Sequence, residues 1–329
     1  EMNVAYSIDK VTMESRATAA AAGGVDSTIS YSISGLNETF TVPPTPQMPT
    51  PMDMTIQVET YVADAKVAAL RSSELLDLWA WFVAHPDKAA VEADFGAMKN
   101  QLRAALPLFD AVTAEGRMTN LTGTTPFGAL SADAATMEIG MNGVKADGKL
   151  REKIVLTGLK LPTEVMPIWV PSLLPDAVTL DLALDGFNLA APAQILLDAI
   201  KPGETLAPEV KAQMLQAALP DGSMRIALAS SGLSSAMSDI SIGGDMKVGP
   251  ALPMPIGSAL IKVTGLDAVM TALQSAPPEV SQQAIPGMMM ARGLATNEGP
   301  DSYSWAIEMA EGGKITVNGM DMSAMGGAQ

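Results

Sequence analysis

The sequence predicts an α+β fold in which a long, curved and mostly antiparallel sheet has pairs of helices packed on one face. Runs that alternate apolar with polar residues recur along the 329 residues, and such alternation is typical of strands with one solvated face. Pairs of helical stretches separate these runs, so the order strand, helix, helix, strand repeats, most clearly over 258–312. Helices that come in pairs between strands disfavour a doubly wound parallel sheet.

The composition indicates ample apolar material for a core and few groups for polar chemistry. Hydrophobic residues make up 48% of the chain, charged residues 17% and aromatic residues 4%. The net charge of −16 disfavours nucleic acid as a partner, because phosphate binding needs clustered Lys and Arg. No apolar run reaches the roughly 18 residues of a spanning helix, so we expect no transmembrane segment in this chain.

Four regions are expected along the chain. Residues 1–42 form a β hairpin region, and residues 43–53 form a rigid connector because of their clustered prolines. Residues 54–177 hold the first strand–helix–helix–strand unit, followed by a β hairpin and a Pro-rich apolar segment. Residues 178–329 hold two further related units, which make up the C-terminal half.

Local signals place individual elements within these regions. In the first unit, a strand over 54–60 is expected to precede a helical region that starts at Asp64. In the middle of the chain, Asn142-Gly143 and Asp147-Gly148 predict the turns of a β hairpin. A further hairpin over 236–248 is expected to turn at Gly243-Gly244.

The second and third units end their first strands in the same way. Gly186-Phe187 and Gly265-Leu266 both follow an alternating run and both precede a helical pair. We therefore expect 178–230 and 258–312 to superimpose as related units.

The candidate ligand-binding residues are all apolar. The helix over 75–84 is apolar nearly all round and needs burial on more than one side, while the prolines of 162–175 allow neither a regular helix nor a central strand. Methionine is the one compositional excess, with 23 residues, and its flexible side chain suits adaptable apolar surfaces, although the same residues also serve as ordinary core filler. The candidates from these stretches are Trp79, Trp81, Phe82, Met166, Ile168, Trp169, Leu173 and Met288.

Catalytic and metal-binding constellations are missing from the sequence. Cysteine is absent, His85 is the only histidine, and no nucleophile elbow or phosphate-binding glycine motif occurs. Asp181 and Asp185 resemble an oxygen-ligand pair only weakly, because Asp-Gly is ordinary turn chemistry. We predict that the protein is not an enzyme and has no catalytic residues, metal site or cofactor. An enzyme that works through carboxylates is the third-ranked hypothesis.

The repeated β runs that close in Gly-Leu or Gly-Phe, together with the ending Lys314-Ile315-Thr316-Val317-Asn318-Gly319, carry a family resemblance. They resemble a family of alphaproteobacterial envelope proteins that contain a domain of unknown function and are distantly similar to AsmA-like periplasmic β-rich proteins. The likeness runs along most of the chain. It implies export by an N-terminal signal peptide, a periplasmic location and a non-enzymatic role in lipid handling, and it assigns no functional residues.

These observations support two hypotheses of different classes. In the first, the protein is a periplasmic, non-catalytic binding protein whose sheet and helices form an apolar groove for a lipid or another hydrophobic ligand. In the second, it is a structural or assembly partner of another cell-envelope protein and has no small-molecule ligand. Ligand that can be extracted from the purified protein would favour the first.

Overall fold

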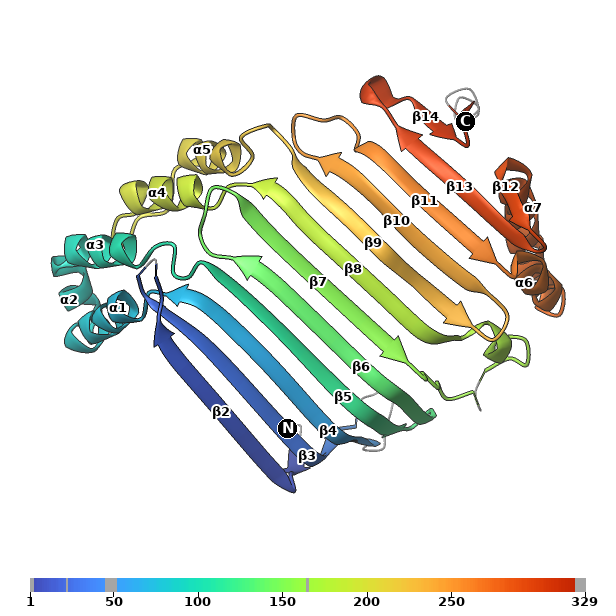
Figure 1. Cartoon of the computed structure of the whole chain (residues 1–329), viewed down its shortest axis with the longest axis horizontal. Helices are drawn as coiled ribbons and strands as arrows, with labels where there is room; N and C mark the ends of the chain where they lie inside the picture. Colours follow the sequence, from blue (N-terminus) through green and yellow to red (C-terminus); the bar gives the residue numbers. More distant parts are fainter. Residues whose placement is uncertain (1–2, 22, 45–51, 164–165, 323–329) are drawn as a thin grey trace.

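The computed structural model describes residues 3–21, 23–44, 52–163 and 166–322, and its strands form one open, curved sheet (Figure 1). The strand order is β1-β3-β4-β5-β6-β7-β8-β9-β10-β11-β13-β14-β15, with β2 also paired to β3 and β12 to β13. Every one of these pairs is antiparallel. Most strands therefore lie beside their neighbours in the chain.

The strands are longest in the N-terminal half. Their bounds are β1 (Asn3–Ser7), β2 (Lys10–Ala19), β3 (Val25–Val42), β4 (Met52–Leu70), β5 (Ala111–Thr125), β6 (Gly128–Asn142), β7 (Gly148–Thr157), β8 (Pro175–Phe187), β9 (Met224–Ser235), β10 (Asp239–Val248), β11 (Ile256–Thr264), β12 (Thr296–Gly299), β13 (Ser302–Met309), β14 (Ile315–Val317) and β15 (Met320–Asp321).

Helices enter the chain between three pairs of strands. Their bounds are α1 (Ser72–Ala84), α2 (Lys88–Ala93) and α3 (Phe95–Ala105) after β4, α4 (Ala190–Ala199) and α5 (Pro208–Ala218) after β8, and α6 (Leu266–Leu273) and α7 (Pro278–Leu294) after β11, with short 3-10 turns η1 (Pro171–Leu173) and η2 (Glu311–Gly313).

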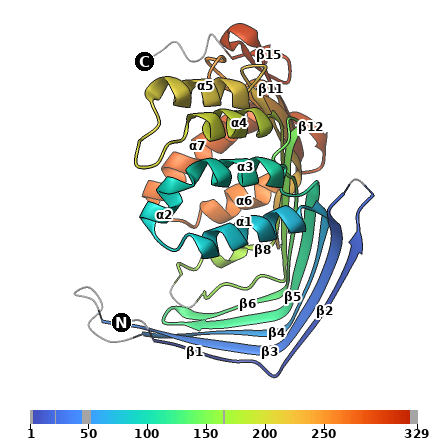
Figure 2. The same ribbon diagram turned by 90° about the vertical axis from the view of Figure 1, so that its left-hand side faces the viewer.

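The helices stand at the ends of the strands and not over the middle of the sheet. In Figure 1, α1 to α5 lie at one end of the strands and α6 and α7 at the other. The reason is strand direction: β4 and β8 run the same way, whereas β11 is three antiparallel steps beyond β8 and runs the opposite way. Figure 2 shows that all the helices project from the same side of the sheet.

One row of residues bends the strands of the N-terminal half. Ser34 pairs with Thr60 and Leu36 with Val58, which leaves Gly35 opposite Glu59 without a ladder pair. The same break continues from strand to strand, and the backbone is left-handed at every second position, with φ of 64°, 49° and 63° at Gly35, Asn120 and Gly158. The whole row is Asp9, Gly35, Glu59, Asn120, Asp133 and Gly158.

Each left-handed residue in this row has an acidic neighbour on the next strand. The Asn120 amide donates to the Glu59 carboxylate, and the Asp133 carboxylate lies where a side chain at Gly158 would be. Beyond the row, the strands turn beneath the helices (Figure 2). The apolar positions of β4 change from even-numbered residues such as Val58 on one side of the bend to odd-numbered residues such as Tyr61 on the other, and Val58 is buried.

The fold has small local cores and no continuous one. In the described chain, twelve hydrophobic residues are buried and twenty-six large hydrophobic residues are exposed. The accessible surface is 19460 Å², whereas a compact monomer of this mass would expose on the order of 13,000 Å². The difference reflects a sheet that is a single layer over much of its area.

Three local predictions were wrong. Asp64 lies inside β4, which continues to Leu70, and α1 begins only at Ser72. The first unit contains three helices, because the stretch after Pro86 divides at Asp94 into α2 and α3.

The pair Gly243-Gly244 is also not a turn, since both glycines lie inside β10. A Cβ at Gly244 would lie only 2.7 Å from the carbonyl oxygen of Ser258, so the glycine permits close approach of β11. The hairpin over 142–148 is confirmed. In the predicted connector, 45–51 lie outside the described residues, and Met52 and Asp53 already belong to β4.

Candidate functional site

One side of the sheet carries four neighbouring rows of apolar side chains, and we call these rows the apolar face. Cross-strand partners lie on the same side of a sheet, so the strand registers define each row. In one row, for example, Val67, Val112, Met141, Leu150 and Leu184 follow one another across five strands. The other rows continue two, four and six residues farther along each strand, and together they extend from β3 to β13.

The members of the four rows on the central strands are Val112, Ala114, Gly116 and Met118 of β5, Ala135, Met137, Ile139 and Met141 of β6, Leu150, Glu152, Ile154 and Leu156 of β7, Val178, Leu180, Leu182 and Leu184 of β8, Ile226, Leu228, Ser231 and Leu233 of β9, and Ile240, Ile242, Gly244 and Met246 of β10.

The opposite side of the sheet is polar, and charged residues on its central strands β6, β7 and β8 form ion pairs. The Arg151 guanidinium donates two hydrogen bonds to the Asp181 carboxylate, and these bonds hold the pKa of Asp181 below its usual range. Lys153 forms an ion pair with Glu138 at 3.1 Å. The alternation of the sequence thus separates a solvated face from an apolar one.

No second layer of the described residues covers the centre of the apolar face. Met137 of β6 is 51% exposed and Leu180 of β8 is 38% exposed, although both lie on inner strands of the sheet. Ten strands at about 4.8 Å spacing make the face roughly 43 Å wide, and its four rows span about 20 Å. The resulting area, on the order of 800 Å², exceeds the few hundred Å² of apolar patch usual on a soluble monomer.

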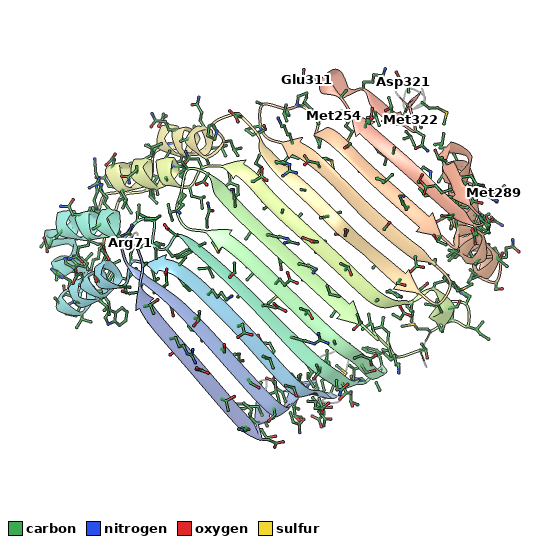
Figure 3. The ribbon with its side chains drawn as sticks, in the orientation of Figure 1. Arg71, Met254, Met289, Glu311, Asp321 and Met322 are labelled. Atoms are coloured by element: carbon green, nitrogen blue, oxygen red, sulfur yellow. The ribbon has the colours of Figure 1, made fainter. Side chains whose placement is uncertain are left out.

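Walls stand along both ends of this face, so that it forms the floor of a trough. On one side, an ion pair of 2.5 Å between Arg103 and Asp198 joins α3 to α4, and α1 to α5 form a continuous wall. On the other side, η1 packs against α6. Leu266 and Met270 of α6 pack with Tyr303 of β13, which places this wall on the apolar side. Figure 3 shows the side chains of the central strands between the two walls.

Aromatic side chains lie only at the lateral margins of the apolar face. Tyr31 and Tyr61 make an edge-to-face contact at one margin, with ring centroids 5.3 Å apart. At the other margin, the Trp305 indole donates to the carbonyl of Ala291 at 2.7 Å, and the Tyr303 hydroxyl lies 3.2 Å from Asp267. Between these margins, the four rows on β5 to β10 consist mainly of aliphatic and methionine residues and contain no aromatic residue.

Glu152 is the only carboxylate in the four rows. Its cross-strand partners are Ile139 and Leu182, and Leu150 and Ile154 flank it on its own strand. No other residue in the described ranges gives its carboxylate a hydrogen bond or an ion pair. The adjacent cations, Arg151 and Lys153, lie on the polar side.

The structure separates the residues predicted from the helix over 75–84. Trp81 is buried, stacks on His85 with ring centroids 4.0 Å apart, and donates to Asp94 at 3.1 Å. Trp79 is 68% exposed and Phe82 is 45% exposed. Trp81 therefore holds α1 to α3 together, and Trp79 and Phe82 remain exposed on this wall.

The other predicted residues lie in the opposite wall. Ile168 is 94% exposed, and Met166, Trp169 and Leu173 are half-buried in the segment around η1. Met288 packs against the core that α6 forms with Tyr303 of β13, while its neighbour Met289 is exposed at the outer margin of the molecule (Figure 3). The structure thus divides the candidates between two walls and brings none of them onto the floor.

Sequence reasoning missed the floor of the trough, including Glu152. The signal was present: in Lys149-Leu150-Arg151-Glu152-Lys153-Ile154-Val155-Leu156, Glu152 is the one charge at an apolar-phase position. Only the register of the paired strands shows that the apolar positions of ten strands lie side by side on the same face of the sheet.

None of the helices in the described ranges is both long and apolar enough to cross a bilayer. Within the same ranges, no three acidic or histidine side chains gather in a way that could hold a metal ion. No family model, curated protein or solved structure matches the chain.

Proposed function

We propose that the protein is a non-catalytic lipid-binding protein of the cell envelope, with a periplasmic location, whose apolar face holds the acyl chains of its ligand. The observation that carries this proposal is the continuity of the four apolar rows across ten strands. An uncovered apolar surface of this size gains on the order of 25 cal/mol for each Å² removed from water.

The dimensions and chemistry of the trough favour hydrocarbon chains. One leaflet of a bilayer core is roughly 15 Å thick, so an acyl chain fits within the span of the four rows and several chains fit side by side. Methionines such as Met118, Met137 and Met141 can adapt to chains of different packing. The walls at both strand ends hinder a flat protein surface from reaching the floor, whereas a thin chain can enter.

The test compares two neighbouring residues that point to opposite sides of β6. Met137→Asp places a charge on the apolar face, and Thr136→Asp places the same charge on the polar face. Met137 is 51% exposed, so its replacement leaves the fold intact. We expect Met137→Asp to weaken binding of a fluorescent fatty acid about tenfold or more, because a buried charge opposes apolar contact.

Thr136→Asp is expected to bind like the wild type, with melting temperatures as the control for folding. Mass spectrometry of an organic extract of the purified protein gives an independent readout. If no lipid is extracted and the wild type binds neither a fluorescent fatty acid nor a fluorescent fatty amine, the carrier function is wrong and the assembly role without a small-molecule ligand is favoured.

We also infer that 178–230 and 258–312 are related units of a repeated strand–helix–helix–strand design. In both, the returning strand pairs next to the strand that precedes the helices, β9 beside β8 and β13 beside β11. Gly186 and Gly265 are both left-handed, with φ of 79° and 85°. Superposition of the backbones of the two segments tests the idea, and different crossing angles of the helical pairs on their strands would contradict it.

A further inference from the structure

We propose that Glu152 is the specificity-determining residue of the apolar face and that it selects lipids bearing a primary amine. This inference rests on the proposed lipid-binding function and names the ligand class.

Among the described residues, Glu152 has no hydrogen-bond or ion-pair partner. Ile139 and Leu182 lie opposite it on the two neighbouring strands, and its same-face neighbours along β7 are Leu150 and Ile154. The nearest cations in the sequence point to the other side of the sheet, where Arg151 binds Asp181 and Lys153 binds Glu138. In the chain as described, no cation reaches this carboxylate from the apolar side.

A ligand that covers the floor changes the environment of this group. An acyl chain laid over Ile139 and Leu182 removes water from the carboxylate between them, and an unpaired charge in an apolar environment is strongly unfavourable. A neutral chain therefore binds poorly over Glu152, and an anionic one adds repulsion. A protonated amine instead donates charge-assisted hydrogen bonds to the carboxylate and removes the penalty.

The net charge of the protein also favours a cationic ligand over an anionic one. With a net charge of −16, the protein attracts cationic ligands and repels anionic ones at low ionic strength. The amine can belong to a single-chain alkylamine or to the ethanolamine of a phospholipid, and the chemistry at Glu152 is the same for both.

The experiment measures binding of three matched ligands, decylamine, decanol and decanoate, by titration calorimetry at low salt. We expect the wild type to bind decylamine about tenfold more tightly than decanol, as charge-assisted hydrogen bonds require, and decanoate most weakly. Glu152→Gln should reduce the amine preference to about twofold or less, and Glu152→Leu should strengthen decanol binding.

Glu115→Gln is the matched control, because it removes the same charge from the polar face of β5 and should keep the preference. Equal affinities of the wild type for all three ligands, or an amine preference that survives in Glu152→Gln, would refute the role of Glu152 while leaving the lipid-binding function intact. If the wild type binds none of the three, the proposed function itself fails.

A second arm distinguishes the two sources of the amine. Lysophosphatidylethanolamine is compared with lysophosphatidylcholine, whose quaternary ammonium cannot donate a hydrogen bond. A preference for the ethanolamine lipid that depends on Glu152 assigns the site to a phospholipid headgroup. A preference confined to decylamine assigns it to single-chain amines.

Discussion

The guanidinium of Arg151 donates two hydrogen bonds to the carboxylate of Asp181, with Nε to Oδ1 at 2.9 Å and Nη2 to Oδ2 at 2.7 Å. This pair joins β7 to β8 on the polar side of the sheet, next to the strand position from which Glu152 faces the apolar side. The Asp181 side chain is 9% exposed, whereas that of Arg151 is 58% exposed. The interaction therefore contributes more than an ordinary surface ion pair.

Asp181→Asn should lower the free energy of unfolding by about 1–3 kcal/mol at pH 7, because it removes charge-assisted hydrogen bonds from a buried acceptor. The pKa of Asp181 is lowered from 3.8 by these bonds, so its contribution is complete above pH 3.8 and is lost as the pH falls toward the depressed folded-state pKa. Urea unfolding at pH 7 and pH 3 measures both effects. A difference between variant and wild type that is the same at both pH values would contradict the assignment.

Gly158→Ala should destabilise the bend by about 1–3 kcal/mol, since φ is 63° there and a Cβ would collide with the Asp133 carboxylate. The double variant Asp133→Ala/Gly158→Ala should recover the part due to the carboxylate, but neither the part due to φ nor that due to the Asp133 Cβ, which would lie 2.8 Å from the added Cβ. Gly140→Ala is the control, because a Cβ there meets only Thr113 at 3.9 Å. Thermal unfolding compares the variants, and equal melting temperatures for Gly158→Ala and Gly140→Ala would show that the row does not impose the bend.

Trp81→Ala should destabilise the wall of α1 to α3 by about 3–5 kcal/mol, as truncation of a large buried side chain does. It removes the stacking on His85 and the hydrogen bond to Asp94. Trp79→Ala, two residues away and 68% exposed, should change stability by less than about 0.5 kcal/mol. Urea unfolding followed by circular dichroism separates the two, and similar losses for both variants would be inconsistent with the structure.

Trp169→Ala should weaken binding of the fluorescent fatty acid several-fold with little change in melting temperature. Trp169 lies in the η1 wall beside α6, and its indole Nε1 is buried without a hydrogen-bond partner in the described part of the chain. Ile168→Ala is the neighbouring control, at a side chain that is 94% exposed. A loss of stability of about 3–5 kcal/mol with unchanged binding would instead identify Trp169 as part of a local core.

The sequence predicted the class of the fold from local signals. Alternation over Lys149–Leu156 predicted a strand with two different faces, and Asn142-Gly143 with Asp147-Gly148 predicted the preceding turn. Paired helical stretches predicted an antiparallel sheet with helices between its strands. For the candidate site, the sequence predicted an apolar surface, but the residues that it named lie in the two walls and not on the floor.

The sequence by itself determined which residues alternate and where the hairpin over 142–148 turns. Tertiary structure decided how far each strand extends and which side chains lie together on the apolar face, because both depend on pairing between strands that are distant in the sequence. Ala63 and Ala65 favour a helix by intrinsic propensity, yet pairing with Tyr31 and Ile29 on β3 keeps them in β4. Likewise, the alternation predicts that Glu152 and Leu182 each point to the apolar side of their own strand. Only the register of β7 and β8 places them side by side on the apolar face.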